Sequence, residues 1–97
     1  MDIEEIKQKM IPIAKEYGVT KLALFGSVAK GETTKESDID ILIEKGDFIR
    51  GVIFFKFCRV LEEALGHRVD VITYTGLENS FFRESILASE VVLYERA

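Results

Sequence analysis

The stretch GSVAKGETTKESDID, residues 26–40, decides the fold of this chain and the chemistry it can carry. Its Gly-Ser pair follows the apolar run of residues 22–25, and after ten further residues Asp38-Ile39-Asp40 opens a second apolar run. Residues two apart in a strand share a face, so Asp38 and Asp40 point one way while the alternating isoleucines point into a core. Two unpaired carboxylates on one face repel each other and are costly to desolvate. A divalent cation removes both problems, and hard oxygen ligands favour magnesium.

The composition is that of an ordinary globular protein. The 97 residues suffice for one core, so we expect one domain over residues 1–97. The net charge of −4 argues against direct binding of nucleic acid. Cys58 is the only cysteine, which excludes an internal disulfide and a cysteine-based zinc site. The first residues do not form a secretory signal and no segment reaches the length of a membrane span, so we expect a cytoplasmic protein.

The spacing of apolar residues predicts helices that alternate with strands. The first helix begins at Asp2 as a capping box with Glu5 and stops at Gly18, with a kink or a break at Pro12. Residues 28–35 are expected to form a turn or a short helix and a polar loop. Strands are expected over residues 21–25, 37–43, 68–74 and 91–94, and further helices over residues 48–65 and 80–89. This order predicts an α/β (α+β) fold in which helices pack on a small mixed β-sheet.

The apolar residues of the last two predicted helices fall into distinct groups. In the helix over residues 48–65, the expected core face consists of Ile53, Phe54, Phe57, Val60, Leu61, Ala64 and Leu65. Phe48, Val52 and Phe55 form a second stripe, which predicts a contact with another molecule unless the terminal helices cover it. In the helix over residues 80–89, the expected apolar contacts are Phe81, Phe82, Ile86 and Leu87.

Asp70 is a third acidic residue, within the predicted strand of residues 68–74. If that strand lies beside the one that carries Asp38 and Asp40, three carboxylates meet and can hold two magnesium ions. Two such ions bind the attacking and leaving oxygens of an in-line phosphoryl displacement. Asp70 would then accept the proton of the attacking hydroxyl. The alternatives are that Asp70 pairs with a neighbour such as Arg68 and that the other two acids are simply exposed at a strand start.

The Gly-Ser pair predicts a phosphate-binding turn. Gly26 lets the backbone approach a phosphate closely, and a short helix that starts near Ser27 would direct its N–H groups at the anion. The Ser27 hydroxyl adds a hydrogen bond, and Lys30 is near enough in sequence to neutralise phosphate charge. The alternative is that Ser27 only satisfies the backbone of a turn.

These motifs together resemble the polymerase-beta-type nucleotidyltransferase superfamily: Gly-Ser, ten residues, Asp-x-Asp, and a further Asp on a third strand. The small size and the segments LALFGSVAKGE and SDIDILIE resemble its minimal nucleotidyltransferases (MNT) over nearly the whole chain. The resemblance implies that Gly26 and Ser27 bind phosphate, that Asp38, Asp40 and Asp70 bind metal, and that AMP passes from ATP to a protein hydroxyl. It also implies a helical HEPN partner, often a ribonuclease toxin, whose antitoxin is the MNT protein and whose tyrosine receives the AMP.

The chain departs from the family pattern at one position. Many relatives have an arginine directly after Gly-Ser, where this chain has Val28, so triphosphate binding would rely more on Lys30. Larger relatives also hold the base and the acceptor with an added helical domain, which predicts that a partner completes this site or that base selectivity is poor. Association of the chain with a second copy also stays open. Two rival functions stay open: a non-catalytic module that neutralises a HEPN partner by contact, and a nucleotidyltransferase that acts on a small molecule or an RNA end.

Overall fold

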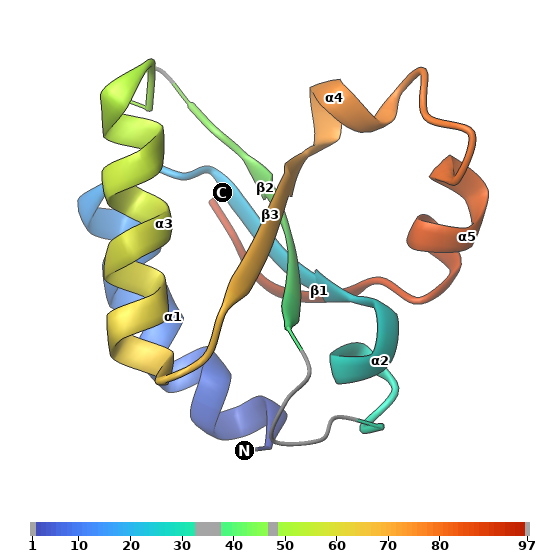
Figure 1. Ribbon diagram of the computed structural model, residues 1–97, viewed down its shortest axis with the longest axis horizontal. Helices are drawn as coiled ribbons and strands as arrows, with labels where there is room; N and C mark the ends of the chain where they lie inside the picture. The colour runs from blue at the N-terminus through green and yellow to red at the C-terminus, as the bar shows by residue number, and fades with distance from the viewer. Residues whose placement is uncertain (1, 33–37, 47–48, 97) are drawn as a thin grey trace.

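A mixed four-stranded sheet with strand order β3-β2-β1-β4 forms the centre of the fold (Figure 1). The computed structural model describes residues 2–32, 38–46 and 49–96. The strands are β1 (Lys21–Phe25), β2 (Ile39–Glu44), β3 (Val69–Thr73) and β4 (Val91–Glu95). β1 runs antiparallel to both β2 and β4, whereas β2 and β3 are parallel. The expected small mixed sheet is therefore confirmed.

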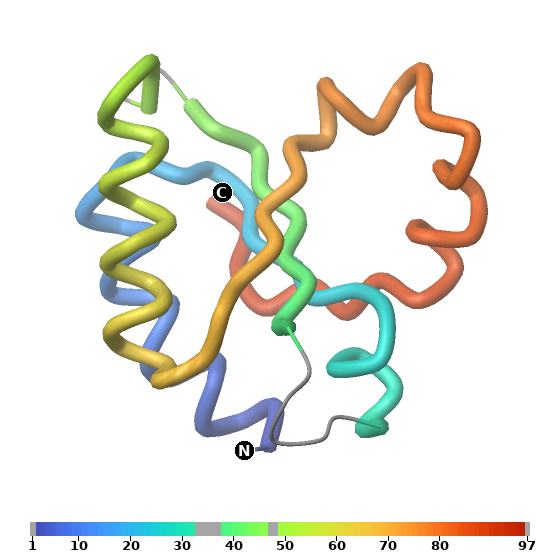
Figure 2. The backbone as a smooth tube through the Cα atoms, in the orientation of Figure 1, coloured from blue at the N-terminus to red at the C-terminus, as the bar shows by residue number. Residues whose placement is uncertain are grey.

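Helices cover the two faces of the sheet unequally. They are α1 (Ile3–Glu16), α2 (Gly26–Ala29), α3 (Val52–Leu65), α4 (Tyr74–Leu77) and α5 (Arg83–Ala88). The two long helices α1 and α3 lie on one side of the sheet, and the short helices α4 and α5 lie on the other. After α5 the chain turns back to run beside β1 as β4 (Figure 2). Among the helices in the described ranges, none combines the length and the apolar composition that a membrane crossing requires.

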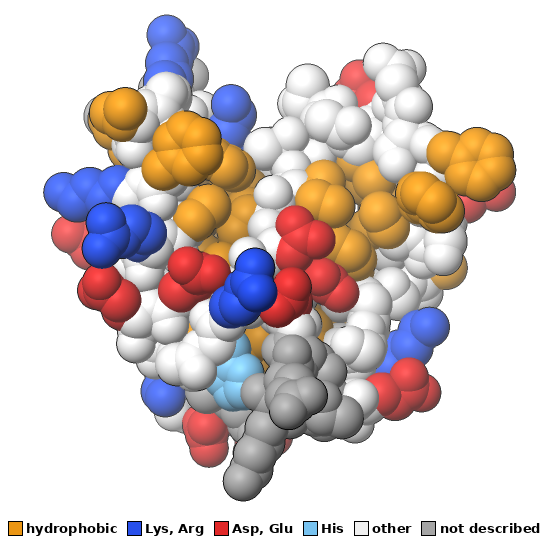
Figure 3. Space-filling view, viewed as in Figure 1, with side chains coloured by type: hydrophobic (Ala, Val, Ile, Leu, Met, Phe, Trp, Pro, Cys, Tyr) orange, Lys and Arg blue, Asp and Glu red, His pale blue; other side chains and the backbone are white. Residues whose placement is uncertain are grey.

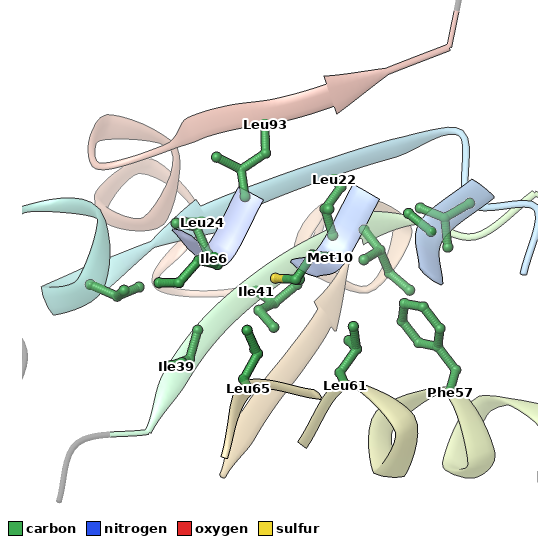
Figure 4. Packing of buried hydrophobic residues seen from close by; sticks show 14 of the residues in the cluster. Ile6, Met10, Leu22, Leu24, Ile39, Ile41, Phe57, Leu61, Leu65 and Leu93 are labelled. Atoms are coloured by element: carbon green, nitrogen blue, oxygen red, sulfur yellow. The ribbon is translucent and has the colours of Figure 1, made fainter. Parts of the chain in front are cut away.

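The main hydrophobic core fills the space between the sheet and the two long helices. Figure 4 shows its centre, with Ile6 and Met10 from α1, Phe57, Leu61 and Leu65 from α3, and Leu22, Leu24, Ile39, Ile41 and Leu93 from the strands. Ile39, Ile41 and Ile43 of β2 all belong to this core, as the alternation of the sequence predicted.

A smaller apolar cluster lies on the opposite face of the sheet. Its buried members are Ala23, Phe25, Leu42 and Leu77, and the half-buried residues packed on it are Ile72, Tyr74, Ile86 and Leu87. Because residues two apart in a strand share a face, Asp40 lies on the same face as Leu42, and Asp70 on the same face as Ile72. The acidic residues therefore project from the sheet face that the short helices cover only in part.

The first helix begins as predicted but is not broken. Asp2 Oδ1 accepts a hydrogen bond from the Glu5 N–H at 2.8 Å, and Gly18 follows the helix with a φ of 71°. α1 runs without interruption through Pro12, so the expected break was wrong. Proline removes a single backbone hydrogen bond, whereas buried residues before and after it, such as Met10 and Ala14, hold both parts of the helix in the core.

α3 begins at Val52 rather than at residue 48. Gly51, with a φ of 52° and a ψ of −126°, precedes it in a conformation that a helix cannot contain, and Ile49 is fully buried in the main core. The predicted core residues Phe57, Leu61 and Leu65 are buried. Ile53 is 42% exposed, so its predicted core position was wrong; the first turn of α3, which also carries the exposed Val52, is uncovered.

The predicted helix over residues 80–89 is shorter and its first aromatic residues are not in the core. Phe81 is 95% exposed and Phe82 64% exposed; their rings contact each other at a centroid distance of 5.4 Å, but neither residue packs on a buried cluster. Ser80 Oγ accepts the Phe82 N–H at 3.1 Å, a local bond that competes with helix formation and delays the start of α5. Ile86 and Leu87 do pack on the smaller cluster as expected. Residues Tyr74–Leu77 form the short helix α4, which follows β3 directly.

Candidate active site

Asp40 and Asp70 are direct neighbours across the parallel strands β2 and β3. Asp38 immediately precedes β2, two residues before Asp40. The expected adjacency of the two acid-bearing strands is therefore confirmed, and all three residues lie near the same end of the sheet. Figure 3 shows acidic side chains gathered in the middle of one face of the molecule, beside a band of hydrophobic side chains.

The Asp40 carboxylate is affected by its two acidic neighbours. Burial raises the pKa of Asp40 above its ordinary value, and the negative charges of Asp70 and then Asp38 raise that pKa further. Each additional negative charge makes the ionised form of Asp40 less favourable. A cation bound beside Asp40 would instead favour its ionised form, so the electrostatics of the cluster suit a cation.

The acidic cluster has oxygen donors of the kind that bind a divalent metal ion, but its side chains are too far apart to bind one in their present positions. Within the described parts of the chain, no three or more His, Cys, Asp or Glu side chains are close enough together to hold an ion as they stand. The donor chemistry and the backbone register nonetheless fit: the only candidate atoms of the cluster are carboxylate oxygens, and Asp40 and Asp70 are paired across adjacent strands. Metal binding by Asp38, Asp40 and Asp70 stays a prediction.

The Gly-Ser turn lies against the Asp40 carboxylate. β1 ends at Phe25, which pairs with Asp40 across the antiparallel strands, and Gly26 follows with a φ of 67°. A Cβ atom added to Gly26 would lie 2.5 Å from Asp40 Oδ2, closer than real Cβ contacts. Only glycine therefore combines this backbone conformation with this close approach.

A residue that the sequence did not indicate holds this turn. The Gly26 N–H, the first of the short helix α2, donates a hydrogen bond of 3.0 Å to Ser89 Oγ. The two residues are 63 positions apart, so no local pattern signals their contact. Ser27 is half-buried in the first turn of α2, where a short helix was expected.

Of the residues that follow the Gly-Ser pair, Val28 is buried and Lys30 is exposed. Val28 is 2% exposed and belongs to the main core, so the position where many relatives carry arginine provides no charge at this site. Lys30 is exposed and follows α2 as its C-cap residue. The role of Lys30 toward phosphate stays a prediction.

The second apolar stripe of the sequence is a surface of α3. Val52 is 80% exposed and Phe55 is 69% exposed, which confirms their predicted position outside the core; Phe48 lies outside the described residues. The two residues line a groove of about 460 Å³, together with Lys56, Arg59, Val60 and Glu63. We call these six residues the α3 groove.

Comparisons with known proteins agree with this geometry. The family model described as "Nucleotidyltransferase domain" matches residues 3–93. A Methanocaldococcus jannaschii protein named "Putative protein adenylyltransferase" is 44% identical over 79% of this chain and 83% of its own length. The protein adenylyltransferase MntA of Thermococcus cleftensis is 31% identical over 81% of this chain and 84% of its own length.

Solved structures share the fold. A minimal nucleotidyltransferase structure superposes with a TM-score of 0.78 at 29% identity, over 94% of this chain and 95% of that one. A toxin–antitoxin structure with AMP-PNP superposes with a TM-score of 0.74 at 22% identity, over 92% of this chain and 73% of that one. The match of the family model over nearly the whole length, with relatives of up to 44% identity, shows that this chain belongs to the nucleotidyltransferase domain family.

Proposed function

We propose that this chain is a magnesium-dependent protein adenylyltransferase that transfers AMP from ATP to a hydroxyl of a HEPN-type partner, a tyrosine by preference, and so acts as an antitoxin. The observation that carries the proposal is the pairing of Asp40 with Asp70 on adjacent strands, with Asp38 two residues before Asp40 and the Gly26 turn against the Asp40 carboxylate. Family membership and relatives that carry the name of protein adenylyltransferase support the type of reaction.

Each residue has a distinct part in the proposed reaction. The turn of Gly26 and Ser27 binds the triphosphate, with Lys30 as a source of positive charge. The acceptor hydroxyl oxygen forms a bond to the α-phosphorus, the bond from that phosphorus to the β-phosphate oxygen breaks, and pyrophosphate leaves. Asp70 accepts the hydroxyl proton. Asp38 and Asp40 would hold magnesium, with Asp70 as a further ligand, and the ion supplies positive charge to the phosphate oxygens.

The partner belongs to the proposal as well. A chain of the same fold, 19% identical and with a TM-score of 0.70, comes from a complex of a tri-AMPylated Shewanella oneidensis HEPN toxin with an MNT antitoxin. We assign the docking surface for a HEPN partner to the α3 groove, because two large apolar side chains there have no cover within the described parts of the chain. A protein that uses ATP and a toxin partner in this way would act in the cytoplasm.

A labelling experiment tests this function. The wild-type chain and an Asp40→Asn variant are incubated with magnesium, a HEPN partner and ATP that carries the label on either the α- or the γ-phosphate. We expect the partner to gain label only from α-labelled ATP and only with the wild-type chain, because pyrophosphate carries the γ-phosphate away.

The rival functions give different results in the same experiment. A non-catalytic antitoxin would inhibit the partner without any incorporation of label. An enzyme that acts on RNA ends or small molecules would leave the partner unlabelled, and the label would appear in the nucleic-acid or small-molecule fraction of a cell lysate.

A further inference from the structure

The Gly26 turn is held in place by a residue from the other end of the chain. Ser89 Oγ accepts the Gly26 N–H at 3.0 Å and donates its own proton to the Ile86 carbonyl oxygen at 3.1 Å. A hydroxyl has one proton to give, and the Ile86 carbonyl takes it. The oxygen lone pairs of Ser89 are then left to face the Gly26 N–H.

The turn needs this external acceptor because its own sequence does not provide one. The first N–H groups of a helix have no partner within the helix, and a Ser, Thr, Asp or Asn at the N-cap usually satisfies one of them. At the start of α2 the N-cap residue is Phe25, which makes no side-chain hydrogen bond to the helix. Ser89 therefore takes over the capping of α2 from a distant part of the chain.

The fold brings the two segments together at one end of the sheet. β1 ends directly before Gly26, and β4 begins two residues after Ser89. β1 and β4 are antiparallel, with Leu24 opposite Val91, so the end of one strand adjoins the start of the other. Ser89 is also the C-cap residue of α5, and its backbone N–H donates to Ile86 as well.

We propose that Ser89 is a positioning residue for the nucleotide: it fixes the Gly26 turn against Asp40 and thereby sets the distance between the phosphate-binding backbone and the acidic cluster. The inference rests on the proposed function for the identity of the nucleotide. Removal of the Ser89 hydroxyl leaves the part-buried Gly26 N–H without an acceptor, so the turn must move to find another.

The test uses three variants of the full chain. Ser89→Ala removes the acceptor, and Ser89→Thr retains a hydroxyl. Ser80→Ala is the matched control, because Ser80 Oγ also accepts one backbone N–H, that of Phe82 at 3.1 Å, but lies outside the site. The affinity for magnesium-ATP is measured by calorimetry, and exchange of the Gly26 amide proton is followed by NMR of ¹⁵N-labelled protein.

We expect Ser89→Ala to weaken magnesium-ATP binding about tenfold and to speed exchange of the Gly26 amide proton, as loss of a part-buried hydrogen bond predicts. Ser89→Thr should restore most of both properties, and Ser80→Ala should change neither. In turnover with a protein acceptor, the KM for ATP should rise while the KM for the acceptor stays constant, a split that a general loss of stability would not produce.

Two results overturn the inference in distinguishable ways. If wild-type chain binds magnesium-ATP and Ser89→Ala binds it equally well, Ser89 positions nothing and the proposed function is unaffected. If the wild-type chain itself does not bind magnesium-ATP, the proposed function fails and the role of Ser89 fails with it. If Ser89→Ala does not fold, the Ser89→Thr variant decides. The inference then requires that the Gly26 amide proton of Ser89→Thr exchanges as slowly as in the wild type, and faster exchange overturns it.

Discussion

The contact between Gly26 and Asp40 gives a prediction whose size follows from the structure. Gly26→Ala places a Cβ atom 2.5 Å from Asp40 Oδ2 and 3.4 Å from Asp40 Cγ, so the carboxylate or the turn must move. Alanine at a positive φ costs roughly 1–2 kcal/mol in any case. Displacing Asp40 from its rotamer adds roughly 0.5–1.5 kcal/mol. The total is modest beside the stability of a typical domain, roughly 5–15 kcal/mol, so the variant should still fold.

Gly31 is a matched control for the backbone part of this cost. Its φ is 73°, close to the 67° of Gly26, but a Cβ added there meets nothing within 4 Å. Gly31→Ala should therefore show the backbone cost alone. We expect Gly26→Ala to be about 1 kcal/mol less stable than Gly31→Ala, a difference of roughly 4–8 °C in melting temperature for a domain of this size.

The two variants should differ more in their affinity for magnesium-ATP than in their melting temperature. Both the Gly26 turn and Asp40 belong to the proposed nucleotide site, so their displacement should greatly weaken magnesium-ATP binding in Gly26→Ala. Gly31→Ala should bind almost normally. Calorimetry on the two folded variants measures this difference, and circular dichroism confirms that both are folded.

A double-mutant cycle with Asp40→Ala isolates the contact. Once the carboxylate is gone, the remaining Cβ of residue 40 lies 3.6 Å from the Cβ of an alanine at position 26, an ordinary contact. The cost of Gly26→Ala in this background should fall to that of Gly31→Ala. Equal melting temperatures for Gly26→Ala and Gly31→Ala, with no coupling to Asp40→Ala, would refute the reasoning.

Three further predictions concern the acids, the turn and the partner. Asp40→Asn should abolish transfer and raise the metal-free melting temperature at neutral pH. Because the pKa of Asp40 in the folded state is raised above 3.8, Asp40 lowers stability as the pH rises from 3.8 through that raised pKa, and the loss is constant at higher pH. The gain should vanish below pH 3.8, and a gain that is the same in acid would contradict this origin. Ser27→Ala should weaken magnesium-ATP binding by roughly 1.5–3 kcal/mol in calorimetry, the value of a hydrogen bond to a charged group, and unchanged affinity would remove Ser27 from the site. Phe55→Ser should keep the melting temperature but weaken partner binding by about 2 kcal/mol in a titration. The equally apolar but separate Phe81→Ser is its control, and an equal loss in both would exclude the α3 groove as the specific surface.

The sheet and the acid positions were predictable because they follow from short-range rules. Alternation fixes which side of β2 faces the core, so the placement of Ile39, Ile41 and Asp40 needed no tertiary information. The position of Asp70 beside Asp40 was only a condition in the sequence argument, and the parallel pairing of β2 and β3, which a strand–helix–strand connection favours, meets it.

The features that sequence reasoning missed depend on contacts between distant segments. Apolar character alone predicted packing contacts for Phe81, but its side chain is 95% exposed and contacts the ring of its neighbour Phe82 rather than the core. α3 started late because Gly51 adopts a non-helical conformation that lets Ile49 enter the core. The hydrogen bond from Gly26 to Ser89 forms only when β4 pairs with β1, so the sequence around either residue contains no signal for it.

The topology explains how one partner can dock on α3 and still deliver a hydroxyl to the acids on the other face of the sheet. β3 is an edge strand of the sheet, and α3 packs beside β3, whereas α1 packs beside β4. On the proposed function, a partner bound in the α3 groove would reach the acidic cluster from the side of the sheet where β3 is the edge strand. The first acid it meets is Asp70, which β3 itself carries and which is exposed. Asp38 and Asp40 come from the inner strand, next to the Gly26 turn. This order across the sheet matches the proposed division of roles, with phosphate and metal held on the inner side and the acceptor proton taken at the edge.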